Sequence, residues 1–164
     1  MADLSTSANL LFLREEELRR GIELLFFAYR DFTKGPDALL AEHGLGRAHH
    51  RAIYFIARHP GITVSRLLSI LRITKQSLSR VLGQLVEKGL VYQEKGRKDR
   101  RQRLLYLTER GAELEKRLSD LQRQRVARAY RDAGADAVAG YRRVLLGLVD
   151  EAERNQILAL IEGS

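Results

Sequence analysis

Two short apolar stripes, each preceded by a threonine, constrain the fold more than any other feature of the chain. Thr63 and Thr74 are favoured helix N-caps, because a threonine hydroxyl accepts a hydrogen bond from the first helical turn. Apolar residues then recur at spacings of three and four, which predicts two short helices that meet across a tight turn. The stripes are Val64, Leu67, Leu68 and Leu71 in the first helix, and Leu78, Val81, Leu82 and Leu85 in the second.

A charged β-hairpin is predicted directly after this helix pair. The segments 90–93 and 104–107 are rich in Leu, Val and Tyr, which is typical of short strands. The stretch from Glu94 to Arg103 between them is polar and strongly basic, so it cannot pack into a core. The order of helix, tight turn, helix and basic hairpin is that of a helix-turn-helix followed by a wing.

The free face of the second helix carries side chains suited to DNA. When 100° per residue is counted from Leu78, the apolar stripe faces inward and the polar residues face outward or flank it. Glutamine can pair with adenine and arginine with guanine in the major groove, and Gly83 would allow a close backbone approach. A solvated polar face is the alternative, and the adjacent basic wing favours DNA. The predicted major-groove residues are Lys75, Gln76, Ser77, Ser79, Arg80 and Gln84.

The wing is predicted to hold phosphates and to place one arginine in a minor groove, where narrow A/T-rich DNA has an enhanced negative potential. Its single acid, Asp99, is interpreted as an internal partner that orients the side chain of Arg101 or Arg103. The predicted wing residues are Arg97, Lys98, Asp99, Arg100, Arg101 and Arg103.

Long amphipathic helices flank the helix pair and the wing. We expect a helix over 11–32 that is stopped by Gly35-Pro36, a short helical segment through Ala41, and another helix over 47–58. After Thr108 we expect one helix running toward Tyr130, a break at 132–136, and one final helix whose apolar stripe extends to Ile161.

The apolar surface of these flanking helices exceeds what the central unit can cover, so a second copy of the chain is predicted to cover the rest. Packing of the helices on one another within one chain is the alternative. The predicted dimerisation residues are Leu11, Leu18, Leu118, Leu121, Tyr141, Leu145 and Leu148.

Composition limits the classes of function. The net charge of +8 favours a polyanionic partner, and the absence of cysteine excludes disulfides and thiol-based sensing within these 164 residues. No nucleophile with a base, paired carboxylates, metal cage or phosphate loop occurs at a recognisable spacing, so we expect neither an enzyme nor a cofactor. No membrane span or leader is evident, so we expect a cytoplasmic, nucleoid-associated protein without a membrane partner.

Four linked motifs give the chain a family resemblance, which covers roughly 11–161. Residues 73–82 look like a recognition helix, 85–91 like its exit into the wing, 99–103 like a wing tip, and 107–111 like the junction into a long dimerisation helix. In this order and spacing they resemble the MarR-type winged helix-turn-helix transcriptional regulators. Gln102 departs from that pattern, which often has an acid there, and this leaves the ion pairing within the wing open.

The resemblance implies a mainly α-helical protein with a small β-wing, in which a winged helix-turn-helix domain is joined to N- and C-terminal dimerisation helices. Residues 1–164 would form a single MarR-like domain, with dimerisation helices at about 10–34 and 109–162 and the DNA-binding region at about 47–108. A homodimer of this kind would bind double-stranded DNA at a pseudo-palindrome whose half-sites lie about 10 base pairs apart. Binding of such a dimer would either repress or activate transcription, and the resemblance leaves both outcomes open.

Family members commonly bind small anionic or phenolic effectors in a cleft between the dimer helices and the DNA-binding region. The candidate cleft residues here are Arg47, His49, His50, Arg51 and Tyr54, with the effector itself unknown. A metal site formed by Glu42, His43, His49 and His50 is not favoured, because adjacent histidines on a helix point about 100° apart. The main alternative function is a nucleoid-type architectural protein that binds DNA with little sequence preference.

Overall fold

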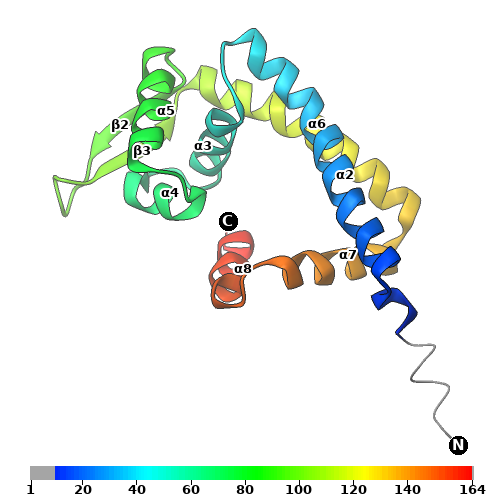
Figure 1. The fold of residues 1–164 in the computed structure, drawn as a ribbon. Helices are drawn as coiled ribbons and strands as arrows, with labels where there is room; N and C mark the ends of the chain where they lie inside the picture. The colour runs from blue at the N-terminus through cyan, green and yellow to red at the C-terminus, as the bar shows by residue number, and fades with distance from the viewer. Residues whose placement is uncertain (1–9, 164) are drawn as a thin grey trace, which may run out of the picture.

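The computed structural model describes residues 10–163 and is mainly helical with one small antiparallel sheet, as predicted (Figure 1). A compact unit of short helices and a hairpin lies at one end of a pair of long helices, and the C-terminal helices turn back beneath it. The elements are η1 (Leu11–Leu13), α2 (Glu15–Glu42), α3 (Arg47–Arg58), β1 (Ile62–Thr63), α4 (Val64–Leu71), α5 (Lys75–Glu87), β2 (Val91–Lys95), β3 (Arg103–Leu107), α6 (Glu109–Ala133), α7 (Ala135–Leu148), η2 (Glu151–Glu153) and α8 (Arg154–Glu162).

The unit from α3 to β3, which we call the head, is built on the predicted helix pair. Thr63 accepts a hydrogen bond from the backbone N–H of Arg66, and Thr74 accepts one from Ser77, both at 3.1 Å, so both predicted caps are confirmed. The α5 stripe is fully buried, whereas in α4 only Leu67 is buried and its other three members are partly exposed. These stripes close over α3, whose Ile53 and Ile56 lie in the same core.

The sheet has three strands in the order β1-β3-β2, one more than the sequence predicted. The hairpin pairs Val91 with Leu107 and Lys95 with Arg103, and β1 adds Ile62 opposite Leu105 on the other side of β3. A strand of two residues before a helix cap is too short to show an alternating pattern, so β1 left no signal in the sequence.

The prediction that Gly35-Pro36 stops the first long helix is wrong. Helix α2 begins at Glu15 and runs through Pro36 to Glu42 without a break. A proline inside a helix costs about 3 kcal/mol, because it removes one hydrogen bond and crowds the preceding turn. Here Pro36, Leu39 and Leu40 are buried against the core, and this packing offsets the local preference.

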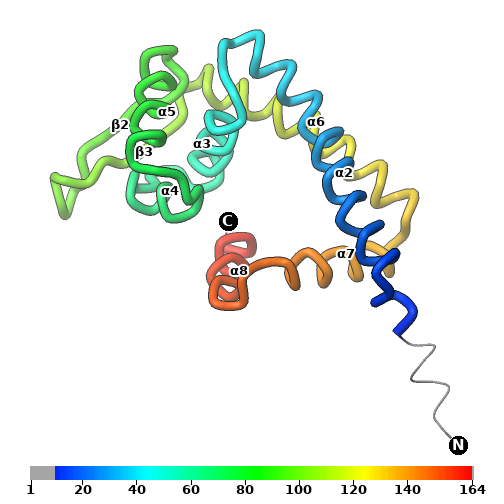
Figure 2. The backbone as a smooth tube through the Cα atoms, in the orientation of Figure 1, coloured from blue at the N-terminus to red at the C-terminus, as the bar shows by residue number. Residues whose placement is uncertain are grey.

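The single final helix that we predicted is divided into α7, η2 and α8. The break between α6 and α7 falls at Gly134, as predicted, but a second break follows Leu148. The guanidinium of Arg154 donates to the carbonyls of Gly147 and Val149 at 3.0 and 3.1 Å and so satisfies the end of α7. The tube in Figure 2 shows α8 turning back under the head as a result.

Candidate nucleic-acid interface

Helix α5 presents a polar face to solvent while its opposite face closes the core of the head. Lys75, Gln76, Ser79 and Arg80 are exposed on this face, as the helical spacing predicted. Ser77 differs, since it is partly buried and its hydroxyl accepts a hydrogen bond from Thr74 at 2.9 Å. Four of the six predicted groove residues are therefore unobstructed, and Ser77 is engaged at the helix cap.

Gln84, the sixth predicted groove residue, has a protein partner that the sequence did not indicate. Its side-chain oxygen lies 2.6 Å from Nε2 of His49, on the first turn of α3. Residues 35 positions apart on different helices share no sequence pattern, so only the packing of α3 against α5 brings them together. His49 was predicted only as a cleft residue.

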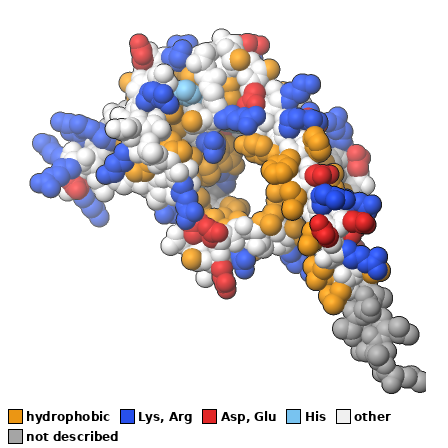
Figure 3. Space-filling model, viewed as in Figure 1, with side chains coloured by type: hydrophobic (Ala, Val, Ile, Leu, Met, Phe, Trp, Pro, Cys, Tyr) orange, Lys and Arg blue, Asp and Glu red, His pale blue; other side chains and the backbone are white. Residues whose placement is uncertain are grey.

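The wing holds its cations on a short, ordered turn. Gly96 donates its backbone N–H to the carbonyl of Gln102, and Gln102 donates to that of Asp99, at 3.0 and 3.1 Å. A Cβ at Gly96 would lie 2.3 Å from the Asp99 carbonyl oxygen, so this position requires glycine. Figure 3 shows the result as a projecting group of basic side chains. The exposed tip cations are Arg97, Lys98, Arg100 and Arg101.

The role predicted for Asp99 needs correction. Its carboxylate accepts a hydrogen bond from the backbone N–H of Arg101 at 2.9 Å, and within residues 10–163 it forms no ion pair with an arginine side chain. In turns, an aspartate carboxylate commonly accepts a hydrogen bond from the backbone N–H two residues later. Arg103 lies on β3 opposite Lys95 rather than at the tip. Asp99 therefore shapes the turn and leaves the guanidinium groups free.

Most of the predicted dimerisation residues are accessible in the single chain. Leu11, Leu18, Leu121, Tyr141 and Leu148 are exposed and Leu145 is partly buried. Leu118 is the exception, because it is completely buried in the chain's own core and so cannot contact a second copy. The sequence pattern identified the apolar side of α6 but not which part of the protein covers it.

Further apolar side chains on α2 are exposed although the prediction did not include them. Leu24 and Phe26 are each 69% exposed and Phe27 is 54% exposed, which is far beyond the usual exposure of such residues. Figure 3 shows apolar side chains along the pair of long helices α2 and α6, which we call the long-helix arm, and around an opening between this arm and the head. The apolar surface of the arm is therefore broader than the predicted stripe.

Two of the candidate cleft residues are engaged within the chain itself. Arg47 is bonded to Asp37 and Thr33 of α2, and His50 is buried in the head. Burial lowers the pKa of His50, which favours the neutral ring, although nearby Glu115 and Asp37 act in the opposite direction. No cluster of three potential metal ligands occurs within residues 10–163.

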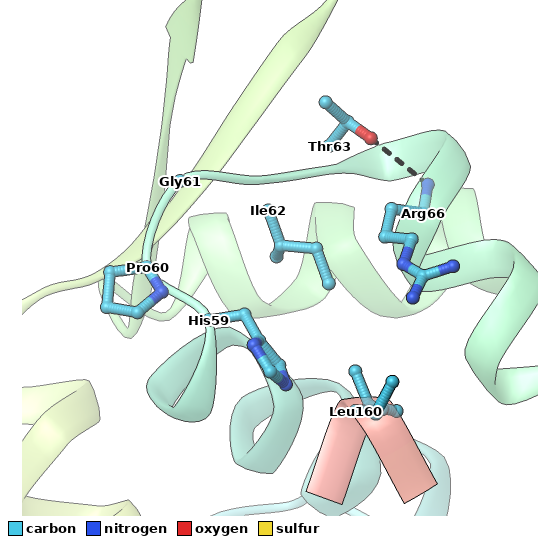
Figure 4. A pocket seen from close by; sticks show the side chains of 8 residues that line it. His59, Pro60, Gly61, Ile62, Thr63, Arg66 and Leu160 are labelled. Atoms are coloured by element: carbon cyan, nitrogen blue, oxygen red, sulfur yellow. Dashed lines mark hydrogen bonds between the residues drawn. The ribbon is translucent and has the colours of Figure 1, made fainter. Parts of the chain in front are cut away.

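Two open cavities lie elsewhere on the head. One of about 480 Å³ lies between α8 and the segment from His59 to Arg66, with Leu160 on its far wall (Figure 4). The other, of about 410 Å³, lies between α4 and α5. Neither is lined by any of the five predicted cleft residues. Among the described helices, none is long and apolar enough to cross a membrane.

A capped helix pair with an exposed polar second helix and a basic wing defines a winged helix-turn-helix protein of the DNA-binding class. The model of the MarR family matches residues 43–102. The HTH-type transcriptional regulator PetP of Rhodobacter capsulatus is 58% identical over 156 residues, which are 94% of each chain. The chain therefore belongs to the MarR family and is a transcriptional regulator of the winged helix-turn-helix type.

Solved structures agree on the fold. Streptococcus pneumoniae FabT in complex with DNA has a TM-score of 0.72 at 19% identity, over 88% of this chain and 99% of that one. A point mutant of E. coli MarR complexed with operator DNA has a TM-score of 0.64 at 23% identity, over 85% and 99%. Staphylococcus aureus MarR in complex with salicylate and kanamycin has a TM-score of 0.66 at 23% identity, over 90% and 93%.

Proposed function

We propose that this regulator binds double-stranded DNA of defined sequence, with α5 in the major groove and the wing against the neighbouring backbone and minor groove. The observation that carries this proposal is the exposed row of Gln76, Ser79 and Arg80 on a helix whose other face is buried and whose cap is satisfied. A rigid helix with free hydrogen-bonding side chains can contact base edges. FabT and E. coli MarR, which share the fold, were both crystallised with DNA, and this supports the proposal.

The binding unit in this proposal is a homodimer. The exposed apolar side chains of η1, α2 and α7 support it, since monomeric proteins rarely leave such a continuous apolar surface uncovered. A two-fold axis would present two heads to one face of the duplex, and the operator would be a pseudo-palindrome with half-sites about 10 base pairs apart. The site of action would then be the nucleoid.

A small-molecule effector is a further part of the proposal. Its support is the S. aureus MarR, which shares the fold and was crystallised with salicylate and kanamycin. Two open cavities on the head, one beside α8 and one between α4 and α5, offer space for such a molecule.

The proposal is tested with DNA from upstream of the regulator's own coding sequence, a scrambled competitor, a salt series and footprinting. We expect a protected palindrome that resists excess competitor. Arg80→Ala should lose preference at one base pair per half-site by about 1–3 kcal/mol, because arginine contacts guanine through two hydrogen bonds.

Arg80→Lys is the matched control for charge. Lysine keeps the positive charge but not the planar pair of donors, so it should lose the same preference with a smaller fall in general affinity. Binding of the wild type without preference for any fragment would contradict the operator model and support an architectural protein that binds DNA through charge and shape.

A further inference from the structure

The first turn of α3 is attached on both sides to helices that have different tasks. Arg47, at its start, donates from its guanidinium to Asp37 at 2.9 Å and to Thr33 at 3.2 Å, and the group lies 5.5 Å from the ring centre of Tyr29. All three partners belong to α2, the long helix of the proposed dimer. Two residues later, His49 contacts Gln84 on α5, the helix proposed to enter the groove.

The ring of His49 has both nitrogens engaged. The backbone N–H of Gly46 donates to Nδ1 at 3.0 Å, so Nδ1 carries no proton and the neutral ring has its proton on Nε2. Nε2–H then donates to the side-chain oxygen of Gln84 at 2.6 Å. His49 is half-buried, which limits the rotation of the ring. The backbone of Gly46 therefore determines the tautomer of His49. In this tautomer the ring presents an N–H donor, and not an acceptor, to Gln84.

This contact orients the amide of Gln84. A side-chain amide has an acceptor oxygen and a donor nitrogen on the same carbon, so the two cannot both face His49. With the oxygen toward Nε2–H, the NH₂ group is directed away from α3. Gln84 lies one helical turn after Arg80 and is itself exposed, so the NH₂ group is available to a ligand of α5.

We propose that His49 is a positioning residue for DNA recognition, which fixes the amide of Gln84 so that it offers a donor to the DNA. This inference rests on the proposed function and goes beyond it. A fixed donor favours an acceptor such as guanine O6 or N7, whereas a freely rotating amide would also accept the adenine amino group. His49 thus determines base preference without contacting DNA.

Two substitutions at position 49 separate this role from a purely structural one. Glutamate and glutamine are both favoured at the third position of a helix, where they accept a hydrogen bond from the N-cap backbone as His49 does from Gly46. His49→Gln keeps an N–H for Gln84. His49→Glu keeps the cap but offers only acceptors, so the amide of Gln84 should turn round and present its oxygen to the DNA.

The experiment compares the wild type, His49→Gln, His49→Glu and Gln84→Ala on an operator selected by the wild type from random DNA, and on all its single base-pair variants. We expect Gln84→Ala to lose discrimination at one base pair per half-site. His49→Glu should change the preferred base at that same pair by about 5-fold or more, and His49→Gln should keep the wild-type preference. Thermal unfolding should be similar for both position 49 variants.

A His49→Glu protein with the wild-type base preference, or one altered at a different pair from Gln84→Ala, would overturn the inference. Long-range ¹H–¹⁵N NMR of the ring gives an independent reading, with the proton expected on Nε2 and its shift changed by Gln84→Ala. A proton on Nδ1 would also overturn it. Failure of the proposed function is distinguishable, because it would appear in the wild type as the selection of no operator at all.

Discussion

Two helical glycines, one in the head and one in α6, have opposite surroundings. A Cβ at Gly83, on the exposed face of α5, would meet nothing within 4 Å, whereas a Cβ at Gly111, in the first turn of α6, would lie 2.0 Å from the backbone oxygen of Leu90. The backbone at Leu90 cannot retreat easily, because it also accepts a hydrogen bond from Thr108 at 3.0 Å. Gly111 is therefore required by packing, and Gly83 is not.

We expect Gly83→Ala to raise the free energy of unfolding by about 0.5–1 kcal/mol, the usual gain when alanine replaces glycine inside a helix. Gly111→Ala should lower it by about 1–3 kcal/mol or more, as overpacking does. Urea unfolding of the two variants provides the comparison. A Gly83→Ala protein that is more stable yet binds the operator less tightly would support a close approach of the α5 backbone to DNA; unchanged binding would contradict it.

His50 makes the stability of the head depend on pH. Its pKa is lowered in the folded protein, chiefly by burial, so the unfolded chain takes up a proton at a higher pH than the folded chain does. The contribution of the neutral ring is complete above about pH 6.5, the ordinary histidine value, and is lost as the pH falls below it. We expect the urea midpoint to fall between pH 7.5 and 5.5, and to fall less in His50→Gln. If the urea midpoint depended equally on pH in the wild type and in His50→Gln, His50 would be excluded as the cause of that dependence.

The wing and α5 were predictable because each one carries its own signal in the sequence. The two segments rich in Leu, Val and Tyr and the basic stretch between them indicated the hairpin, and helical spacing indicated the exposed row on α5. Contacts between elements were not predictable: the bond from His49 to Gln84, and the burial of Leu118 within its own chain, depend on how helices pack. The continuation of α2 through Pro36 also depends on packing between helices, because burial of this part of α2 outweighs the tendency of proline to end a helix.

The wing's cations and its acid should act differently on DNA binding. Each tip cation that neutralises a phosphate releases a counterion, so Lys98→Ala or Arg100→Ala should reduce the slope of log affinity against log salt by about 1 for each phosphate that is no longer neutralised. Asp99→Ala removes the bond to the Arg101 backbone but no cation, so it should lower affinity without reducing the slope. The measurement is a salt titration on operator DNA. A slope that is unchanged in both cation variants would place the phosphate-binding groups elsewhere.

The head is connected to the rest of the chain at several separate points. Thr108 joins the turn after α5 directly to α6, since it caps α6 and also donates to the carbonyl of Gly89. Arg72, in the turn before α5, forms an ion pair with Glu153 at 2.5 Å and lies 3.6 Å from Asp150, so the segment after α7 is attached to the head as well. The head is therefore attached to α6 through Thr108 and to the segment after α7 through Arg72.

The proposed dimer is the property on which the proposed geometry of DNA binding depends most. Leu18 on α2 and Leu148 on α7 are 50% and 64% exposed, so a lysine at either position should fit the single chain without disturbing its core. We expect Leu18→Lys and Leu148→Lys to halve the mass in analytical ultracentrifugation while the circular dichroism remains helical. Arg19→Ala, at an exposed polar position on the same helix, should leave the mass unchanged.

Loss of the dimer should weaken operator binding by about 10²–10⁴-fold, because two linked heads bind two half-sites with a high effective concentration. Binding to a single half-site should change much less, since each head remains folded. The ratio between the two affinities thus isolates the contribution of the dimer from that of the head. If a protein of monomeric mass kept the full affinity for the complete operator, one head would be sufficient for binding and the dimer model would be wrong.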